Sequence, residues 1–429
     1  MALTEQIKTA YSEILHEELL PAMGCTEPIA IAFAAAILRD ALGRDPEQIV
    51  ALCSGNIVKN VKSVIVPATG GMHGIEAAVA AGVISARPAL RLEVLSVLTD
   101  ADRVRIAEFC KACDIRVEEL ESKYPFDLML EGFCDKSKAS VRIQQNHTNV
   151  TLVEHNGEDI TTRYTSFSCS ATGERGSDRS LLNVQDIIRF ADEVALDGLR
   201  SLLTRQLEMN LAIAEEGLRG NYGACIGKLL YKGGNAELRD RAKAYAAAGS
   251  DARMSGCELP VCILSGSGNQ GITASVPVAI YAKEWGCDEE KLLRALLVAD
   301  LITVHQKTGI GCLSAYCGAI SAGCGAACGV AYLAGGGFYE IAHTLVNSVA
   351  ILSGTICDGA KPSCAAKIAM AVDAGLLGYE MMREGRQFYS GDGIVTKGVE
   401  NTIRNVGRLA RDGMGETDRE IIRIMLGQG

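Results

Sequence analysis

Residues 308–339 read TGIGCLSAYCGAISAGCGAACGVAYLAGGGFY, a run of 32 residues without a charged side chain. This stretch decides the fold class, because its length alone would allow a helix that crosses a membrane. It consists mainly of Gly, Ala, Ser and Cys and holds only two leucines, so its transfer into lipid would gain little free energy. The run is therefore better explained as a helix, or a pair of helices, buried at the centre of a soluble protein.

The composition of the whole chain agrees with closely packed helices. Of the 429 residues, 48% are hydrophobic, only 5% are aromatic, and 46 are glycine. Small residues let helix backbones approach one another, whereas a β-sandwich needs more aromatic and β-branched residues. The formal net charge is −10 without any block of like charges, so we expect neither nucleic acid nor a membrane as a partner.

The N-terminus and the cysteines indicate where the protein acts. The first residues, MALTEQIKTAYSEIL, contain acidic side chains and no continuous apolar stretch, so they do not resemble a secretory signal. The chain has 16 cysteines. Without an export signal, we expect these to be reduced thiols in a cytoplasmic protein rather than disulfides.

The hydrophobic pattern changes near residue 90 and again near residue 183. Helical spacing predicts helices over 7–18, 29–42 and 75–85, with a loop-rich stretch over 54–74. A capped helix over 100–113 is then accompanied by strand-like runs at 92–98, 115–120, 128–133, 139–143, 149–154 and 160–164, with an Asn-Gly hairpin signal at 156–157. We therefore predict an α+β fold. A mainly helical, Gly/Ala-rich catalytic core (residues 1–88 and 167–429) carries an inserted small α+β lobe (residues 89–166).

The C-terminal cysteines form the first candidate site. Cys357 and Cys364 enclose CDGAKPSC, in which Gly359 and Pro362 favour a loop that turns both sulfurs inward. The uncharged run before this loop carries three cysteines that would share one face of a continuous helix: Cys317, Cys324 and Cys328. One thiolate from that face and two from the loop would suit an iron–sulfur cluster with one iron open to substrate. For Cys324 and Cys328, a purely structural position in the core is the favoured interpretation.

A zinc or redox site is the alternative use of cysteine. Cys110 and Cys113 form a C-x-x-C pair, but the pair lies near the end of a predicted helix and has no partner pair at zinc-ribbon spacing. A thioredoxin-like role would need the pair at the start of a helix. Neither role is favoured.

A glycine-rich motif, SGSGNQG at residues 265–271, follows the strand-like LPVCIL. Its GxGxxG spacing is that of a dinucleotide-binding loop. However, no clear strand follows it, and Pro277 is expected to interrupt the helix. A glycine-rich turn at a helix start also binds a carboxylate through its N–H groups, with Asn269 and Gln270 as further donors. We interpret the loop as the carboxylate site of an amino acid, with a structural turn as the alternative.

The motif GCTEP at residues 24–28 marks another helix start, signalled by Thr26 and Pro28. Cys25 would then lie near the positive end of the helix dipole. That position is expected to lower the pKa of the thiol, so that the thiolate could act as a nucleophile or a general base. An inert cysteine is an equal alternative.

Taken together and in this order, the motifs resemble the iron–sulfur L-cysteine desulfidase family, a relative of the α-chain of iron–sulfur L-serine dehydratases. The similarity extends along the whole chain and is carried by GCTEP, SGNIVKN followed by PATGG, SGSGNQG, LSAYCG and ICDGAKPSCAAKIA. The resemblance implies a 4Fe–4S cluster held by Cys317, Cys357 and Cys364. An alignment on the serine dehydratases would instead place the first ligand at Cys324.

The resemblance also implies roles for residues outside the cluster. Cys25 would be the catalytic base, and the polar residues of the two glycine-rich loops would bind substrate: Ser54, Asn56, Lys59, Asn60, Asn269 and Gln270. Lys361, between the loop cysteines, is expected to stabilise the cluster or the substrate anion, with a surface ion pair as the alternative. Among the histidines, His305 is the best candidate for the site, with helix capping as the alternative.

The expected function is that of a lyase in cysteine catabolism. It would eliminate the side chain of a small amino acid, L-cysteine, to give pyruvate, ammonia and hydrogen sulfide. L-serine dehydratase is the close alternative, because the same residues would serve a hydroxide leaving group. A non-catalytic iron–sulfur redox sensor is the distant alternative. We expect a homodimer, since Gly/Ala-rich helical proteins of this size often form one.

Overall fold

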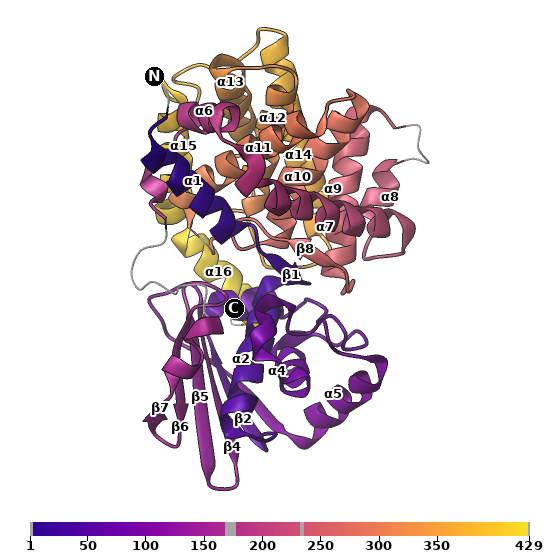
Figure 1. Cartoon of the computed structure of the whole chain (residues 1–429), viewed down its shortest axis with the longest axis vertical. Helices are drawn as coiled ribbons and strands as arrows, with labels where there is room; N and C mark the ends of the chain where they lie inside the picture. Colours follow the sequence, from indigo (N-terminus) through magenta and orange to yellow (C-terminus); the bar gives the residue numbers. More distant parts are fainter. Residues whose placement is uncertain (1–2, 168–176, 232–235, 312, 428–429) are drawn as a thin grey trace.

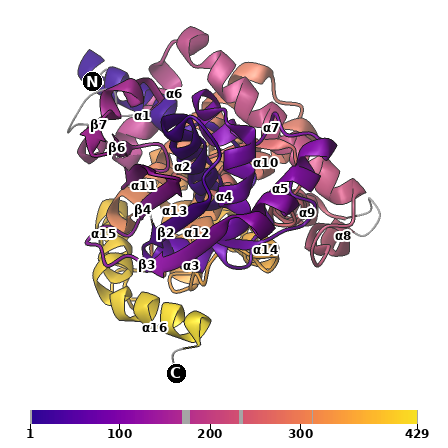
Figure 2. The same cartoon turned by 90° about the horizontal axis from the view of Figure 1, so that it is seen from below.

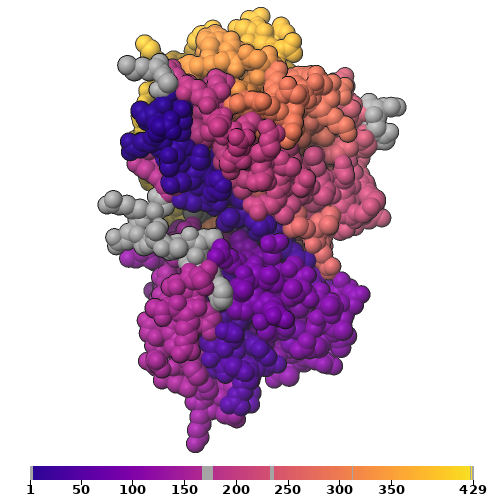
Figure 3. Space-filling model, in the orientation of Figure 1, coloured from indigo at the N-terminus to yellow at the C-terminus, as the bar shows by residue number. Residues whose placement is uncertain are grey.

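The computed structural model describes residues 3–167, 177–231, 236–311 and 313–427. Within these residues the chain forms two lobes, a large helical lobe and a smaller lobe built on a sheet (Figure 1). The fold is α+β and mainly helical, as the sequence predicts. In the space-filling view the N-terminal helix descends along the helical lobe toward the boundary with the sheet-bearing lobe (Figure 3).

The helical lobe surrounds α12, the helix formed by the uncharged run. Its helices are α1 (Glu5–Glu18), α6 (Val184–Glu193), α7 (Arg200–Arg219), α8 (Ile226–Tyr231), α9 (Leu238–Met254), α10 (Gly268–Glu284), α11 (Glu289–Ile310), α12 (Gly318–Leu333), α13 (Phe338–Ile351), α14 (Cys364–Arg383), α15 (Val399–Arg408) and α16 (Gly415–Leu426). A short antiparallel pair, β1 (Pro21–Met23) and β8 (Pro260–Cys262), lies at the lower edge of this lobe.

Small residues explain why α12 occupies the centre. It packs against α10, α11, α13 and α14, and a Cβ added at Gly323 would lie 2.4 Å from the carbonyl oxygen of Ala371 on α14. Only a residue without a side chain permits that approach of two helix backbones. The run is therefore a buried helix, as predicted, and no helix in the described ranges is long and apolar enough to cross a membrane.

The second lobe carries a six-stranded mixed sheet in the order β3-β2-β4-β5-β6-β7. The strands are β2 (Gln48–Cys53), β3 (Asp114–Glu119), β4 (Asp127–Cys134), β5 (Ser137–Gln144), β6 (Val150–His155) and β7 (Glu158–Asp159). β2 runs parallel to β3 and antiparallel to β4. Asn156 and Gly157 both have positive φ, 51° and 84°, so the predicted hairpin joins β6 to β7 through a turn of the expected kind.

Helices cover one face of this sheet. α2 (Thr26–Leu42) packs on β4 and β5, and α4 (Gly74–Ser85) lies against α2 and α5 (Asp100–Ala112). α2 is buried along most of its length, because the sheet lies on one side of it and α4 on the other. α3 (Gly55–Val61) of this lobe packs against α16. α16 follows α15 in the chain, and both lie along one side of the molecule (Figure 2).

Three expectations for this lobe differ from the structure. The run at 92–98 is not a strand: it begins in a 3-10 helix, Pro88–Glu93, in which Arg91 has φ 50°. Leu92, Val94 and Leu95 are buried, and the 3-10 helix packs against α2 instead of pairing in a ladder. The run at 160–164 is a 3-10 turn, because the Thr161 hydroxyl accepts the Val153 N–H at 2.8 Å and so replaces a strand partner. Finally, the sheet includes β2, which lies before residue 89.

A candidate active site between the lobes

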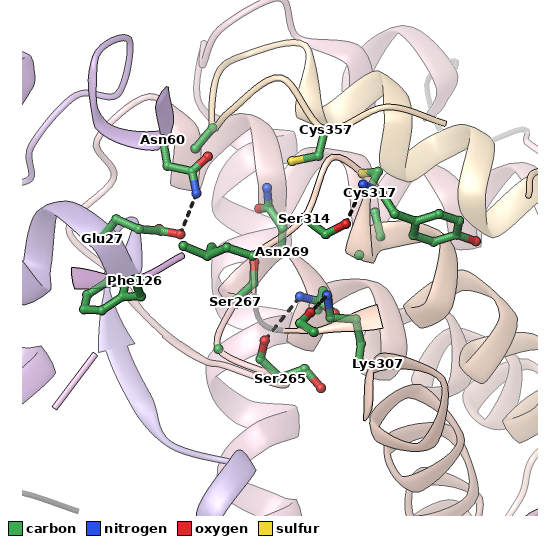
Figure 4. A pocket seen from close by; sticks show the side chains of 18 of the residues that line it. Glu27, Asn60, Phe126, Ser265, Ser267, Asn269, Lys307, Ser314, Cys317 and Cys357 are labelled. Atoms are coloured by element: carbon green, nitrogen blue, oxygen red, sulfur yellow. Dashed lines mark hydrogen bonds between the residues drawn. The ribbon is translucent and has the colours of Figure 1, made fainter. Parts of the chain in front are cut away.

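A cavity of about 350 Å³ lies where the two lobes meet, within the range of small-molecule sites. Its wall combines residues of the α2 start and the β5–β6 turn with residues of the helical lobe. Figure 4 shows Glu27, Asn60 and Phe126 on the sheet-bearing side, and Lys307, Cys317 and Cys357 on the helical side. The cavity therefore needs both lobes.

Three of the predicted cysteines lie in this wall: Cys317, Cys357 and Cys364. Cys317 is the N-cap of α12, and Cys364 is the first residue of α14. The Cys317 N–H donates to Thr355 O at 3.0 Å, and the Cys357 N–H donates to Ala315 O at 2.6 Å. This antiparallel contact between two loop segments holds the Cys317 and Cys357 side chains next to each other.

Among these three cysteines, the surroundings of Cys357 favour its thiolate. A hydrogen bond from the Cys317 thiol lowers the pKa of Cys357 to about 6, and the positive charges of Lys59 and Lys367 act in the same direction against burial. The same hydrogen bond, together with burial, raises the pKa of Cys317. Burial also raises the pKa of Cys364. The group thus has two lysines near it that would stabilise additional negative charge.

The donor set, three cysteines, is that of an iron–sulfur cluster with one open iron. Within the described ranges, no three His, Cys, Asp or Glu side chains are grouped so that they could hold one metal ion. A 4Fe–4S cluster places each thiolate on a different iron, so its three sulfurs need not meet at one point. Three cysteines around one cavity, with lysines beside them, suit that group.

The alternative ligand Cys324 lies elsewhere. It is inside α12 at 2% exposure, and burial raises the pKa of its thiol to about 12. Cys328 is fully buried in the same helix. The expected common helix face is wrong for Cys317, because α12 begins only at Gly318.

Cys25 and Glu27 form a buried pair at the start of α2. Cys25 is the N-cap residue at 3% exposure, and its thiol donates to Glu27 Oε2 at 3.2 Å. Burial, and then the negative charge of Glu27, raise the pKa of Cys25 well above its usual value. The expected lowering by the helix N-terminus is therefore wrong, because desolvation and a carboxylate at close range outweigh the dipole.

Glu27 itself is held as a carboxylate. Burial raises its pKa, but a hydrogen bond and the charge of His147, together with the Cys25 thiol, bring the pKa down to about 2. Glu27 Oε1 accepts from Asn60 Nδ2 at 2.9 Å and lies 3.9 Å from His147 Nε2. The His147 ring packs edge-on against Phe126, with centroids 4.7 Å apart.

The predicted substrate-binding residues divide into two groups. Four line the cavity: Lys59, Asn60, Asn269 and Gln270. Lys59 Nζ also pairs with Asp418 Oδ1 of α16 at 2.5 Å. The amide oxygens of Asn269 and Gln270 are buried without a hydrogen-bond partner in the described ranges, so both are available to a ligand.

The other candidates lie outside the wall. Ser54 Oγ donates to Pro125 O at 2.7 Å, and Asn56 is half-buried. Lys361 pairs with Asp358, as its alternative interpretation expects. His305 Nε2 lies 2.6 Å from Glu400 Oε2. None of these four side chains contributes to the cavity.

The glycine-rich loop 265–271 makes a tight turn into α10. Ser265 and Gly266 have φ 48° and 75°, and α10 begins at Gly268. The helix continues through Pro277 to Glu284, so the expected interruption is wrong. Packing against α9, α11 and α12 holds the helix together across the proline.

Among the wall residues that sequence reasoning missed, Glu27, His147 and Arg253 carry charge or can titrate. Glu27 stands inside the quoted motif GCTEP, two residues after Cys25, so the motif itself could have indicated it. His147 and Arg253 carry no local signal, because only the folded chain brings the β5–β6 turn and the end of α9 to the cavity.

Known proteins resemble this chain over most of its length. A profile of the serine dehydratase alpha chain matches residues 89–423. A "UPF0597 protein" of Desulfitobacterium hafniense is 55% identical over 418 residues, which is 97% of this chain and 96% of that protein. A protein of the same name from Finegoldia magna is 45% identical over 97% of this chain and 99% of its own. One from Treponema denticola is 42% identical over 99% of this chain and 100% of its own.

Proposed function

The chain belongs to the serine dehydratase alpha chain family, and on this premise we propose that it is an iron–sulfur-dependent lyase that acts on L-cysteine. The products would be pyruvate, ammonia and hydrogen sulfide. The observation that carries the proposal is that Cys25, Cys317, Cys357 and Cys364 line one cavity together with unpartnered polar side chains. We propose that the enzyme acts in the cytoplasm as a homodimer.

The cofactor assigned by this proposal is a 4Fe–4S cluster on Cys317, Cys357 and Cys364. When bound, such a cluster supplies an open iron that acts as a Lewis acid for the departing sulfur. The hydrogen bond from Cys317 and the charges of Lys59 and Lys367 support the thiolate state of Cys357, one of the three ligands.

The protein's own residues would handle the proton. We propose that the Cys25 thiol first passes its own hydrogen to the carboxylate of Glu27, which accepts it at 3.2 Å, and then takes the α-proton of the substrate as a thiolate. The positive charge of Arg253 lowers the pKa of Cys25 against the larger effects of burial and Glu27. Loss of the α-proton and of the side-chain sulfur leaves aminoacrylate, which hydrolyses to pyruvate and ammonia.

L-Serine is the second candidate substrate, favoured by the name of the matched family. The two substrates differ only in the leaving atom, and the cavity would hold either. The ratio of their kcat/KM values decides between them.

The test is anaerobic reconstitution of the full chain with iron and sulfide, followed by assay with L-cysteine, L-serine, L-threonine and D-cysteine. We expect a 2-oxo acid from L-cysteine, with stoichiometric sulfide and ammonia, and a smaller kcat/KM for L-serine. A protein that gains the cluster but releases no 2-oxo acid from any of the four would contradict the lyase and favour a redox sensor. A larger kcat/KM for L-serine would replace the desulfidase by the dehydratase.

A further inference from the structure

Arg253 is a buried cation with no acidic partner among the residues that the structure describes. It lies at the end of α9 in the cavity wall, is 2% exposed, and donates from Nε to the carbonyl oxygen of Gly24 at 3.0 Å. One of its terminal nitrogens is buried without any hydrogen-bond partner, and no ion pair joins it to an acid in the described part of the chain. An uncompensated buried charge costs several kcal/mol, so the fold retains it at a considerable cost.

Other cations of the wall differ from Arg253 in this respect. Lys59 pairs with Asp418 at 2.5 Å, Lys367 pairs with Asp358 at 2.5 Å, and Arg179 pairs with Glu18 at 2.7 Å. Their charges are already compensated inside the protein. An anion that enters the cavity would therefore gain more from Arg253 than from any of these three cations.

The start of α10 supplies the second observation. Gly268 is the first residue of this 17-residue helix, Ser267 makes no side-chain capping bond, and the first turn holds no acidic residue. A Cβ added at Gly268 would lie 2.4 Å from Nε and 2.9 Å from Cζ of Arg253. The guanidinium thus lies at the positive end of a helix dipole. The two positive charges repel each other, and an anion bound between them would relieve that repulsion.

We infer that Arg253 and the N-terminus of α10 together bind the α-carboxylate of the substrate. This inference rests on the proposed function and deepens it, because it names the residue that recognises an amino acid as such. A guanidinium presents two parallel N–H groups that match the two oxygens of a carboxylate. Nothing larger than glycine leaves room for it at position 268.

The position of Arg253 also relates binding to chemistry. Its Nε donates a hydrogen bond to the carbonyl oxygen of Gly24, the residue before Cys25. A carboxylate held on this guanidinium therefore places the adjacent α-carbon near the Cys25 sulfur. The free amide oxygen of Asn269, one residue after Gly268, is available to accept a hydrogen bond from the substrate ammonium.

The experiment compares L-cysteine with L-cysteine amide, which lacks the carboxylate charge, in wild type and Arg253→Met. We expect wild type to prefer L-cysteine strongly. In Arg253→Met, kcat/KM for L-cysteine should fall about 100-fold or more, while kcat/KM for the amide changes less than about tenfold. Arg241→Met is the matched control, because Arg241 lies on the same helix and pairs with Glu284 outside the cavity; its preference should stay that of wild type.

A binding readout separates this inference from the proposed function. L-Alanine has no leaving group, so its protection of the reconstituted protein against thermal unfolding reports binding alone. Wild type should be protected and Arg253→Met should not. If wild type releases no 2-oxo acid from any amino acid, the proposed function fails. If wild type is active but Arg253→Met keeps both the preference and the protection by L-alanine, this inference fails alone.

Two further variants cover a failure of Arg253→Met to fold. Arg253→Lys keeps the charge but loses the two parallel N–H groups of the guanidinium. We therefore expect a higher KM for L-cysteine with iron content unchanged. Gly268→Ala would push the guanidinium aside and should raise KM more than it lowers kcat. Wild-type KM in both folded variants would overturn the assignment.

Discussion

At the residue scale, the buried thiol of Cys25 donates a hydrogen bond to the carboxylate of Glu27, with 3.2 Å between Sγ and Oε2. A catalytic base should be separable from a cluster ligand. Cys25→Ala should keep the iron content and absorbance of the cluster, yet lose about two to four orders of magnitude in kcat, as expected for a missing general base. Cys25→Ser should not restore activity, because a hydroxyl at the same place is far less acidic than a thiol.

Two measurements on this variant decide the role of Cys25. Iron analysis after anaerobic purification tests for ligation, and pyruvate release tests for catalysis. Loss of iron in Cys25→Ala would make it a ligand, whereas near-normal turnover would leave it a structural residue.

The ligand assignment makes a second prediction at this scale. Cys357→Ala and Cys364→Ala should each lose the cluster absorbance, because each removes one of three thiolates. Cys317→Ala should behave the same way, whereas Cys324→Ala should keep the cluster, since Cys324 lies inside α12 rather than in the cavity wall.

Visible absorbance and iron content of the four purified variants provide the measurement. Full iron in both loop variants would rule out a cluster at this site. Activity retained in Cys317→Ala but lost in Cys324→Ala would transfer the third ligand to α12.

At the element scale, a buried carboxyl joins α11 to α7. Asp300 Oδ1 accepts from Gln206 Nε2 at 2.9 Å, and both side chains are fully buried. Burial raises the pKa of Asp300 to about 7, only partly opposed by Gln206. From about pH 4 to pH 7 the unfolded chain has therefore lost a proton that the folded chain keeps, so this group lowers the stability as pH rises.

Asp300→Asn should remove that dependence. It keeps the shape and the hydrogen-bonding capacity of the neutral acid, so the variant should gain on wild type by about 1.4 kcal/mol per pH unit across the window. Urea unfolding at pH 5, 6, 7 and 8, with matched iron content, measures the difference. A gap between the two proteins that stays constant with pH would show that Asp300 is not protonated in the fold.

Secondary structure could be predicted where the signal is local. The helix 100–113 is found as α5 (Asp100–Ala112), whose Thr99 and Asp102 form a capping box, and the Asn-Gly turn is found where two positive φ angles require it. β2 (Gln48–Cys53) could not be found this way, because its partners β3 and β4 lie more than 60 residues away in sequence. Within residues 92–98, the side chains of Leu92, Val94 and Leu95 are buried although the backbone forms no strand, so their apolar pattern resembles that of a strand.

At the scale of the whole molecule, the site residues also divide into those with a local sequence signal and those without one. The motifs with Cys25, Asn269 and the loop cysteines are local, so the sequence could indicate them. Arg253 and His147 have no such motif, and only the meeting of the two lobes brings them to the cavity. The pKa of Cys25 could not be predicted either, since it depends on burial and on Glu27 more than on the helix dipole.

The last prediction concerns which part of the chain supplies the cluster ligands. Residues 89–166 place the β5–β6 turn in the cavity wall, but the cysteines of this stretch lie elsewhere: Cys110, Cys113 and Cys134. Cys110 and Cys113 stand at the end of α5, where burial raises the pKa of both thiols, and Cys134 is the last residue of β4. We therefore predict that residues 89–166 supply no cluster ligand.

Replacing Cys110, Cys113 and Cys134 together by Ser should leave iron content and cluster absorbance unchanged. Some loss of stability is expected, because Cys113 and Cys134 are buried and a hydroxyl is costlier to bury than a thiol. Iron per chain must therefore be measured on the folded fraction, with Cys364→Ala as the positive control for ligand loss. A triple variant that folds but binds no iron would move a ligand into residues 89–166 and contradict the division, because Cys317, Cys357 and Cys364 alone would then be insufficient.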